Sequence, residues 1–450
     1  MPFVSSRVAV GLALLSASSI GCGDEGPRLP AEVRVTEGDG QIAPVGTLLP
    51  VPIAITVLNA DGAPAVGVPV NWQADTDGRL LAVERTTDAN GQARARWQLG
   101  TSEGERQAQA ILTGLEPAVF TATAEGPDAV PFDQILPLHF DTYDGSGQVV
   151  HPDFAATPAG VFGRPFHLAI TPYPYANPAL ENPSFFESTR RSVWTLPEGG
   201  PNPVVLPGSG YLSDPDLVYV PEAAELWLYY REVSSENVVR LMRTRDGVTW
   251  SEPLTVLHVP NHQAVSPSVV RRAPDDWWMY VVNSGRSGCD AASTAVDVRR
   301  STDGIHWDEP QGAGLLLPGF WPWHIDVQWI PTRGVFWALY NAKTDRGCVT
   351  PALYLAESAD GYAWNVLSRP VMTTGVTPAL ENIVYRSTFE YDVASDAITF
   401  WMSGARYEAG RYVWGAVVER RRRADIFAPL AARVDPRTFP SPPAPLTDWP

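Results

Sequence analysis

Short segments in which apolar and polar residues alternate, separated by turn residues, dominate residues 31–125. Residues 53–57, 68–72 and 93–97 form three such segments, and the last alternates strictly. Asn-Ala-Asp-Gly at 59–62 and Asp-Ala-Asn-Gly at 88–91 are strong turn signals. Because side chains alternate between the two faces of a strand, this pattern predicts several short strands packed as a β-sandwich.

A longer repeat follows. Polar segments recur at successive intervals of 63, 52, 58 and 64 residues, and each is followed by a strongly apolar strand such as residues 226–230 or 335–339. The polar segments are His151-Pro-Asp153, Asp214-Pro-Asp216, Ser266-Pro-Ser268, His324-Ile-Asp326 and Thr388-Phe389-Glu390. Five four-stranded units of this size predict a five-bladed β-propeller, with the polar segments opening the innermost strands.

A heptapeptide that ends in Trp marks most of these units. It reads Ser-Thr-Asp-Gly-Ile-His-Trp at 301–307 and Ser-Ala-Asp-Gly-Tyr-Ala-Trp at 358–364, with a close variant at 244–250 and a degenerate one at 188–194. Asp-Gly forms a tight turn, and the Trp can fill the gap between neighbouring sheets. The heptapeptide resembles the Asp-box of sialidases, in which it lies away from the active site, so we interpret it as architecture.

The composition agrees with an all-β chain, because 43 prolines, 37 glycines and 16 tryptophans punctuate and fill many short elements. The predicted organisation is a signal peptide at 1–22, a tether at 23–30, an immunoglobulin-like sandwich at 31–125, a linker at 126–137, a propeller at 138–434 and a Pro-rich tail at 435–450.

The N-terminus predicts export. Arg7 precedes the apolar residues 8–15, a stretch too short to span a bilayer. Ser-Ile-Gly-Cys at 19–22 resembles the lipobox of bacterial lipoproteins, which implies lipidation of Cys22 and anchoring to a membrane at the cell surface or in the periplasm. Simple cleavage and secretion is the alternative.

The sandwich resembles the bacterial Ig-like domains of invasin and intimin. The matching segments are Asp61-Gly62-x-Pro64, residues 67–70, residues 87–91, Trp97-x-Leu99-Gly100 and residues 120–124. The resemblance implies a rigid spacer without catalytic residues.

Charge and cysteines limit the partners. The net charge of −17 disfavours binding to nucleic acid, because such a surface repels phosphate. In an oxidising compartment Cys289 and Cys348 can form a disulfide, with two buried free thiols as the alternative. Ligand spacings typical of zinc sites are missing, so we predict neither a metal site nor a cofactor.

If the inner strands start at one mouth of the propeller, their polar residues converge there. Crowded carboxyl groups raise one another's pKa, which suits the acid and base of glycoside hydrolysis. The candidate catalytic residues are Asp153, Asp216, Asp326 and Glu390, and the candidate substrate-binding residues are His151, Asp214, His324, Glu181, Trp323 and Tyr175. Trp321 and Tyr173 are further aromatic faces for sugar rings.

The arrangement resembles five-bladed glycoside hydrolases of the arabinofuranosidase and fructan hydrolase type. Asp153 matches their first carboxylate by position, and the segment at 213–216 matches the second. Blade three offers Ser266-Pro-Ser268 where these families place a glutamate acid, so the acid would be Glu390, Glu181 or His324.

Two main hypotheses follow: a surface glycoside hydrolase that acts on extracellular polysaccharide, or a propeller that binds glycan without cleaving it. Structural display is a third. The alternative for each single polar residue is structural, since an aspartate can cap a strand entry by accepting hydrogen bonds from backbone amides.

Overall fold

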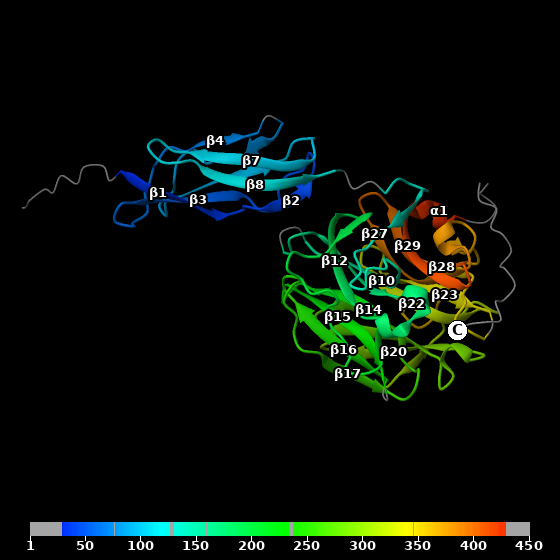
Figure 1. Cartoon of the computed structure of the whole chain (residues 1–450). Coiled ribbons are helices and arrows are strands. Elements are labelled where there is room, and N and C mark those ends of the chain that lie inside the picture. Colours follow the sequence, from blue (N-terminus) through cyan, green and yellow to red (C-terminus); the bar gives the residue numbers. More distant parts are fainter. Residues whose placement is uncertain are drawn as a thin grey trace, which may run out of the picture.

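The computed structural model describes residues 29–428, except residues 76, 127–129, 159–160, 235–236 and 345. The predicted signal peptide, Cys22, most of the tether and the Pro-rich tail lie outside the described residues. Within the described part, no helix is both long and apolar enough to cross a membrane. Figure 1 shows two β bodies in chain order, a sandwich and then a propeller.

The first body consists of two four-stranded sheets that share one apolar core. One sheet has the order β1 (Pro30–Glu37), β3 (Ile53–Asn59), β6 (Gln92–Gln98) and β5 (Arg79–Leu81). The other has the order β2 (Gln41–Pro44), β8 (Ala118–Glu125), β7 (Gly104–Ile111) and β4 (Asn71–Ala74), with β2 parallel to β8. The buried side chains of β6 alternate with exposed ones, as the sequence predicts. A sandwich is therefore observed, whereas its kinship with the invasin domains stays a prediction.

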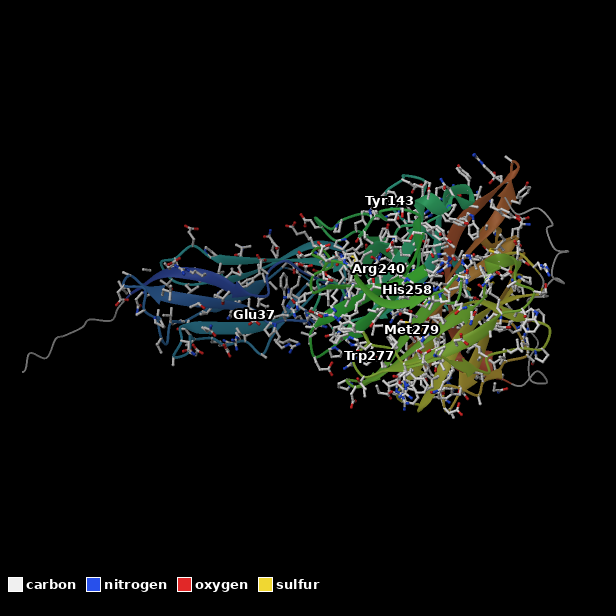
Figure 2. All side chains as sticks on the ribbon, turned by 90° about the horizontal axis from the view of Figure 1, so that it is seen from below. Glu37, Tyr143, Arg240, His258, Trp277 and Met279 are labelled. Atoms are coloured by element: carbon white, nitrogen blue, oxygen red, sulfur yellow. A yellow bond between two sulfur atoms is a disulfide. The ribbon has the colours of Figure 1, made fainter. Side chains whose placement is uncertain are left out.

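The second body contains five sheets, which confirms the prediction of a five-bladed propeller. Blade one is β10 (Val149–Ala156), β11 (Phe166–Pro172), β12 (Ser184–Arg190) and β13 (Val193–Thr195); blade two is β14 (Tyr211–Val220), β15 (Glu225–Val233), β16 (Asn237–Thr244) and β17 (Leu254–Val259). Blade three is β18 (Val265–Ala273), β19 (Asp276–Asn283), β20 (Ala295–Ser301) and β21 (Gln311–Ala313); blade four is β22 (Trp321–Ile330), β23 (Val335–Lys343), β24 (Ala352–Ser358) and β25 (Asn365–Val366), and β26 (Met372–Thr373) also pairs with β24. Trp277 and Met279 of β19 are buried within the propeller, whereas Glu37 belongs to the sandwich (Figure 2).

Blade five closes the propeller with strands from both ends of this body. Its sheet contains β27 (Ile383–Asp392), β28 (Ala397–Glu408), β29 (Arg411–Arg422) and the early strand β9 (Ile135–Leu138). The predicted linker 126–137 therefore ends in a propeller strand. Pairing of the first strand with the last blade satisfies edge amides that would otherwise be exposed. The helical elements are short: η1 (Pro174–Ala176), η2 (Pro178–Leu180), η3 (Gly288–Asp290), η4 (Pro378–Leu380) and α1 (Arg423–Phe427).

A ring of hydrogen bonds around the axis corrects the alignment of blade five. In each blade, one inner-strand side chain accepts a hydrogen bond from an amide of the next blade. These acceptors are Asp153 (from Leu217, 2.7 Å), Asp216 (from Val269, 3.0 Å), Ser268 (from Val327, 2.8 Å), Asp326 (from Phe389) and Thr388 (from Phe154, 3.4 Å). Thr388 thus corresponds to Asp153, and Arg386 corresponds to His151. The sequence alignment had placed blade five two residues too late.

The Asp-Gly-Trp turns join neighbouring blades on the outside. Asp303 accepts hydrogen bonds from the amides of Ile305 and His306, both at 2.8 Å. The carbonyl of Gly304 in the same turn accepts one from the hydroxyl of Tyr229 in blade two, at 2.9 Å. A Cβ at Gly304 would lie 2.8 Å from that hydroxyl oxygen, so glycine is required for this approach. The turn is architectural, as the sequence predicts.

We expect Asp303→Ala to lower the free energy of unfolding by about 1 kcal/mol, because two backbone amides lose their acceptor. Asp308→Ala is the control, since Asp308 is exposed and its carboxylate makes no hydrogen bond among the described residues. Urea unfolding of the two variants measures the difference. Equal stability of both would contradict the structural role of the turn.

Candidate active site

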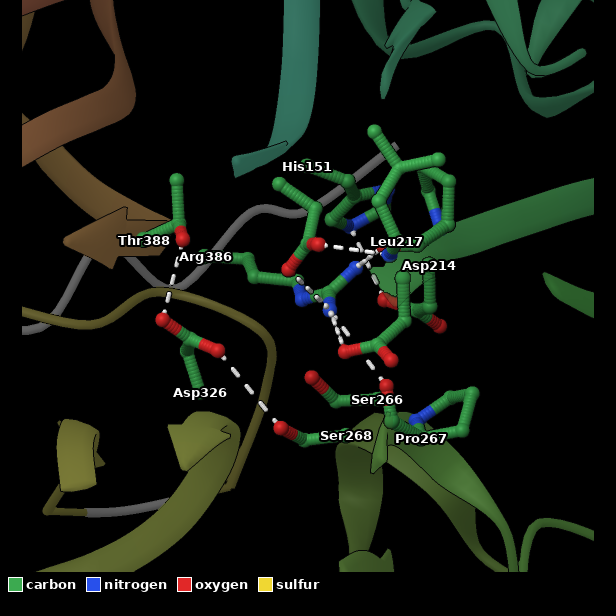
Figure 3. A network of polar contacts seen from close by, with 12 residues as sticks. His151, Asp214, Leu217, Ser266, Pro267, Ser268, Asp326, Arg386 and Thr388 are labelled. Carbon is green, nitrogen blue, oxygen red and sulfur yellow. Dashed lines mark hydrogen bonds and ion pairs between the residues drawn. The ribbon is translucent and has the colours of Figure 1, made fainter. Parts of the chain in front are cut away.

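Arg386 closes the centre of the propeller. Its side chain is fully buried, and Nη2 lies 3.4 Å from Asp153 Oδ1 and 3.7 Å from Asp216 Oδ1. Nη1 donates to the carbonyl of Pro215, and Nη2 donates to that of Pro267 at 3.3 Å. Figure 3 shows the guanidinium in the middle of this network, which also contains Asp326 and Thr388. Arg386 therefore links blade five to blades one, two and three.

The three ring carboxyl groups share this one cation. Oxygens of Asp153, Asp216 and Asp326 lie within 4.8 Å of one another. Burial raises the pKa of Asp153 well above its usual value, and the neighbouring carboxylates add to the rise. Burial likewise raises the pKa of Asp216 to about 7 and that of Asp326 to about 6, against the opposing effect of Arg386. Each also accepts a backbone amide, so these carboxyl groups are committed to the fold.

The residues two positions earlier face the mouth of the propeller. A bulge in the inner strand places His151 and Asp214 at positive φ, 59° and 52°. Side chains with a Cβ rarely adopt this conformation, and the strain recurs at functional sites. The bulge turns these side chains away from the ring and into a cavity of about 280 Å³, which we call the funnel cavity.

Two imidazoles meet one carboxylate in the funnel cavity. Asp214 Oδ1 lies 3.4 Å from His151 Nε2 and 3.2 Å from His324 Nδ1, and all three residues are buried. The ligand atoms of this trio fall within 4.8 Å of one another. No hydrogen bond of good geometry reaches the buried atoms His151 Nε2 and Asp214 Oδ1 or either nitrogen of His324, although Asp214 and His324 approach to 3.2 Å. Orphaned atoms of this kind call for a ligand, and two imidazoles with a carboxylate fit a divalent transition metal.

Burial sets the charge of the trio. It lowers the pKa of His151 well below its usual value and also lowers that of His324, although Asp214 acts in the opposite direction. Burial opposes ionisation of Asp214, but His151, His324 and Arg386 outweigh it and hold its pKa well below normal. Neutral imidazoles beside an ionised carboxylate are the protonation states that a metal ion requires.

Glu181 enters the cavity from the segment that follows β11. Its Oε1 lies 3.8 Å from His151 Nδ1, and the side chain is buried. Burial raises the pKa of Glu181 well above its usual value, and the charge of Asp214 adds to this. Pro174 and Pro178 begin two short helical turns just before it, which stiffen the segment. A buried carboxyl group of raised pKa can take up and return a proton near neutral pH.

Aromatic rings and a disulfide form the walls. Trp323 Nε1 donates to the hydroxyl of Tyr385 at 3.1 Å, and both residues line the cavity. Cys289 and Cys348 form the expected disulfide, which joins loops of blades three and four at the cavity edge. Lys343 Nζ donates to the carbonyls of Cys289 and Ala291, at 2.7 and 2.9 Å, and holds this edge in place.

The structure separates the candidate residues into groups. Funnel-lining residues are His151, Asp214, His324, Glu181, Trp323 and Tyr173. Asp153, Asp216 and Asp326 lie in the ring instead. Glu390 does not line the cavity: it pairs with Arg191, at 2.5 and 3.0 Å, because blade five is shifted from the sequence alignment. Tyr175 is exposed, with Arg411 3.7 Å from its ring centre, and Trp321 is outside the cavity lining.

Sequence reasoning missed Arg386, Arg231, Tyr385 and Tyr211. Arg231 Nη1 lies 3.9 Å from Asp214 Oδ2. Arg386 had a signal, since it lies 62 residues after His324, close to the repeat length, but the search was for a carboxylate.

No family model matches the chain. The A type blood N-acetyl-α-D-galactosamine deacetylase of Flavonifractor plautii is 26% identical over 349 residues, which cover 65% of this chain and 45% of that protein. The chain thus spans less than half the length of this relative.

Among solved structures, an N-acetylgalactosamine deacetylase from F. plautii, in complex with blood group B trisaccharide, has a TM-score of 0.60 at 24% identity, over 65% of this chain and 96% of that one. It shows the fold. A thermostable family-43 glycoside hydrolase has a TM-score of 0.43 at 9% identity, over 61% and 88% of the two chains, which is too distant to carry an argument.

We expect Arg386→Met to lower the free energy of unfolding by about 3–5 kcal/mol, because it leaves buried carboxylates without their cation. Arg333→Met is the matched control, since Arg333 is exposed. Chemical denaturation of both variants checks this. A loss no larger than that of the control would show that the ring does not depend on Arg386.

Proposed function

We propose that this protein is a metal-dependent deacetylase that removes the acetyl group from an N-acetylated sugar residue of a glycan. The observation that carries the proposal is the buried trio His151, Asp214 and His324, whose unpartnered nitrogen and oxygen atoms converge in the funnel cavity. The F. plautii relative is an N-acetyl-α-D-galactosamine deacetylase, which supports the choice of the acetamide bond.

The trio fits a first-row divalent ion such as Zn²⁺. His151, Asp214 and His324 would hold it, and imidazole with carboxylate is a common ligand set for this class of metal. A bound divalent ion acidifies water and polarises a carbonyl oxygen, which is the chemistry that amide hydrolysis needs. Arg231, 3.9 Å from Asp214, and the neighbouring Glu181 fix the orientation of the two ligands that they contact.

Glu181 is the proton-transfer group. Its carboxylate accepts a proton from the attacking water and then delivers it to the nitrogen of the departing amino sugar, so that the products are acetate and a free amine. Glu181 lies beside His151 and is therefore close to the trio, but it is not one of the three proposed metal ligands. Burial from bulk water keeps the transferred proton inside the site.

Tyr385 is placed to stabilise the reacting carbonyl oxygen. Its ring centre lies 4.4 Å from that of His324, and its hydroxyl accepts the Trp323 hydrogen bond, which leaves the hydroxyl proton for a ligand. Burial keeps the phenol protonated by raising its pKa. A donor aimed at developing negative charge lowers the barrier of acyl transfer.

Deacetylation is favoured over glycoside hydrolysis by the placement of the carboxyl groups. Glycoside hydrolysis needs two of them on either side of the scissile bond. Asp153 and Asp216 instead bind backbone amides and Arg386 in the ring. In the funnel cavity, Asp214 is enclosed by two imidazoles, which leaves Glu181 as the carboxyl group available for proton transfer.

We further propose that the enzyme works outside the cytoplasm on glycans. The lipobox-like segment that ends at Cys22 supports export and a lipid anchor, and the sandwich would serve as an Ig-like spacer between anchor and propeller. The disulfide between Cys289 and Cys348 is consistent with an oxidising compartment.

Removal of metal tests the proposal directly. We expect the full chain, after treatment with a chelator, to lose hydrolysis of methyl N-acetyl-α-D-galactosaminide and methyl N-acetyl-α-D-glucosaminide, measured as released acetate, and to regain it with Zn²⁺, Mn²⁺ or Co²⁺. Asp214→Asn should bind less than one metal ion per chain and lower kcat/KM by about 100-fold or more. The control is Asp308→Asn. Full activity in metal-free protein would refute the proposal.

Glu181→Gln tests the proton-transfer step. We expect kcat to fall by between about 100-fold and 10,000-fold, the usual contribution of a general acid–base group, while one metal ion per chain is retained. Glu198→Gln, which changes an exposed glutamate outside the cavity, is the control. If kcat of Glu181→Gln matched that of the control, another group would have to move the proton.

A further inference from the structure

One polar side chain of the funnel cavity has no part in the mechanism above. His262 lies between β17 and β18 and lines the cavity together with Gly288 and Cys289. It does not belong to the repeating inner-strand segments, and its ring is half-buried rather than enclosed.

Arg231 fixes the ring of His262. Nη2 of Arg231 lies 2.6 Å from His262 Nδ1 and 3.1 Å from Asn237 Oδ1. The guanidinium itself is buried, and its other terminal nitrogen faces Asp214. One guanidinium thus joins the trio to His262, so that their positions are correlated across the cavity.

The backbone on either side of His262 is also held. Its amide donates to the carbonyl of Gly285 at 3.0 Å, and its own carbonyl accepts from the amide and hydroxyl of Ser284, at 3.0 and 2.9 Å. These hydrogen bonds hold the main chain at His262, and the hydrogen bond between Arg231 Nη2 and Nδ1 holds its imidazole.

The hydrogen bond with Arg231 determines which nitrogen of His262 carries the proton. A guanidinium only donates, so Nδ1 must accept, and the ring proton resides on Nε2. Among the described residues, no acceptor contacts Nε2. His262 consequently presents a fixed N–H donor whose partner has to come from outside the chain.

The disulfide-linked edge packs against the same ring. Gly288 has φ +54°, and a Cβ there would lie 3.1 Å from Cδ2 and 3.4 Å from Nε2 of His262. Only glycine combines this φ with such a close approach. Gly288 precedes Cys289, so the bridge to Cys348 holds this glycine against the ring of His262.

We propose that His262 is a specificity-determining residue, which donates a hydrogen bond from Nε2 to a hydroxyl oxygen of the sugar whose acetamido group lies at the His151–Asp214–His324 trio. The inference rests on the proposed function. Arg231 lies between Asp214 and His262. A sugar ring whose acetamido group lies beside Asp214 can therefore bring one of its hydroxyl groups to Nε2 of His262. A fixed donor in the cavity wall favours a sugar whose hydroxyl oxygen accepts its hydrogen bond over a sugar that lacks this acceptor.

Binding and kinetics of the full chain test the inference. Calorimetry measures Kd for methyl N-acetyl-α-D-galactosaminide and methyl N-acetyl-α-D-glucosaminide in wild type, His262→Ala, His262→Gln and His139→Ala. We expect His262→Ala to weaken binding of the preferred glycoside about tenfold or more, with wild-type metal content and a larger effect on KM than on kcat. His262→Gln keeps an N–H donor and should recover most of the affinity. His139 is exposed and serves as the control.

The outcomes separate the two proposals. If His262→Ala bound as tightly as His139→Ala, the role of His262 would be wrong while deacetylation stood. If wild type bound a glycoside without releasing acetate, the proposed function would fail and the Kd series would still judge His262. If wild type bound neither glycoside, both proposals would fail.

Discussion

The guanidinium of Arg386 on the propeller axis is the interaction on which the site depends. It is buried against Asp153 and Asp216 and against the carbonyls of Pro215 and Pro267, so four blades meet at one cation. Three carboxyl groups this close would otherwise repel one another in a medium of low polarity. Arg386 compensates the charge of these carboxyl groups and thereby fixes the inner strands. The inner strands in turn form the floor of the funnel cavity.

In blades one and two, a single three-residue segment of the inner strand contributes both to the funnel cavity and to the ring of hydrogen bonds. In blades one and two, the residue at the bulge faces the funnel cavity, whereas the residue two positions later accepts an amide of the next blade. Because the bulge precedes the ring residue so closely, a correctly closed ring also sets the position of His151 and Asp214. Their positive φ values are a local cost of about 1–3 kcal/mol each, offset by the ring below. Rigidity of the fold and geometry of the site therefore have one origin.

Sequence analysis recovered what is periodic. The repeat predicted the blades, the Asp-Gly-Trp turns and the convergence of polar residues at one mouth, because each depends on local pattern and strand order. It misaligned blade five, where Thr388 occupies the position of the expected carboxylate and Glu390 provided a false match. It predicted no metal site, since the trio comes from three blades and has no local spacing. Glu181, Arg231 and His262 could not be predicted as partners, because tertiary packing alone brings their segments together.

The two layers of carboxyl groups differ in chemistry because their charges are compensated in different ways. The ring layer has Arg386 and backbone amides for its carboxyl groups, so the carboxyl oxygens of this layer are satisfied within the chain. The funnel layer has Asp214 between two imidazoles, of which His151 Nε2 and both nitrogens of His324 lack hydrogen-bond partners of good geometry. A fold tolerates such atoms when a ligand completes them, because desolvated donors and acceptors otherwise cost free energy. The layer that the chain leaves incomplete is therefore the layer at which we place the chemistry.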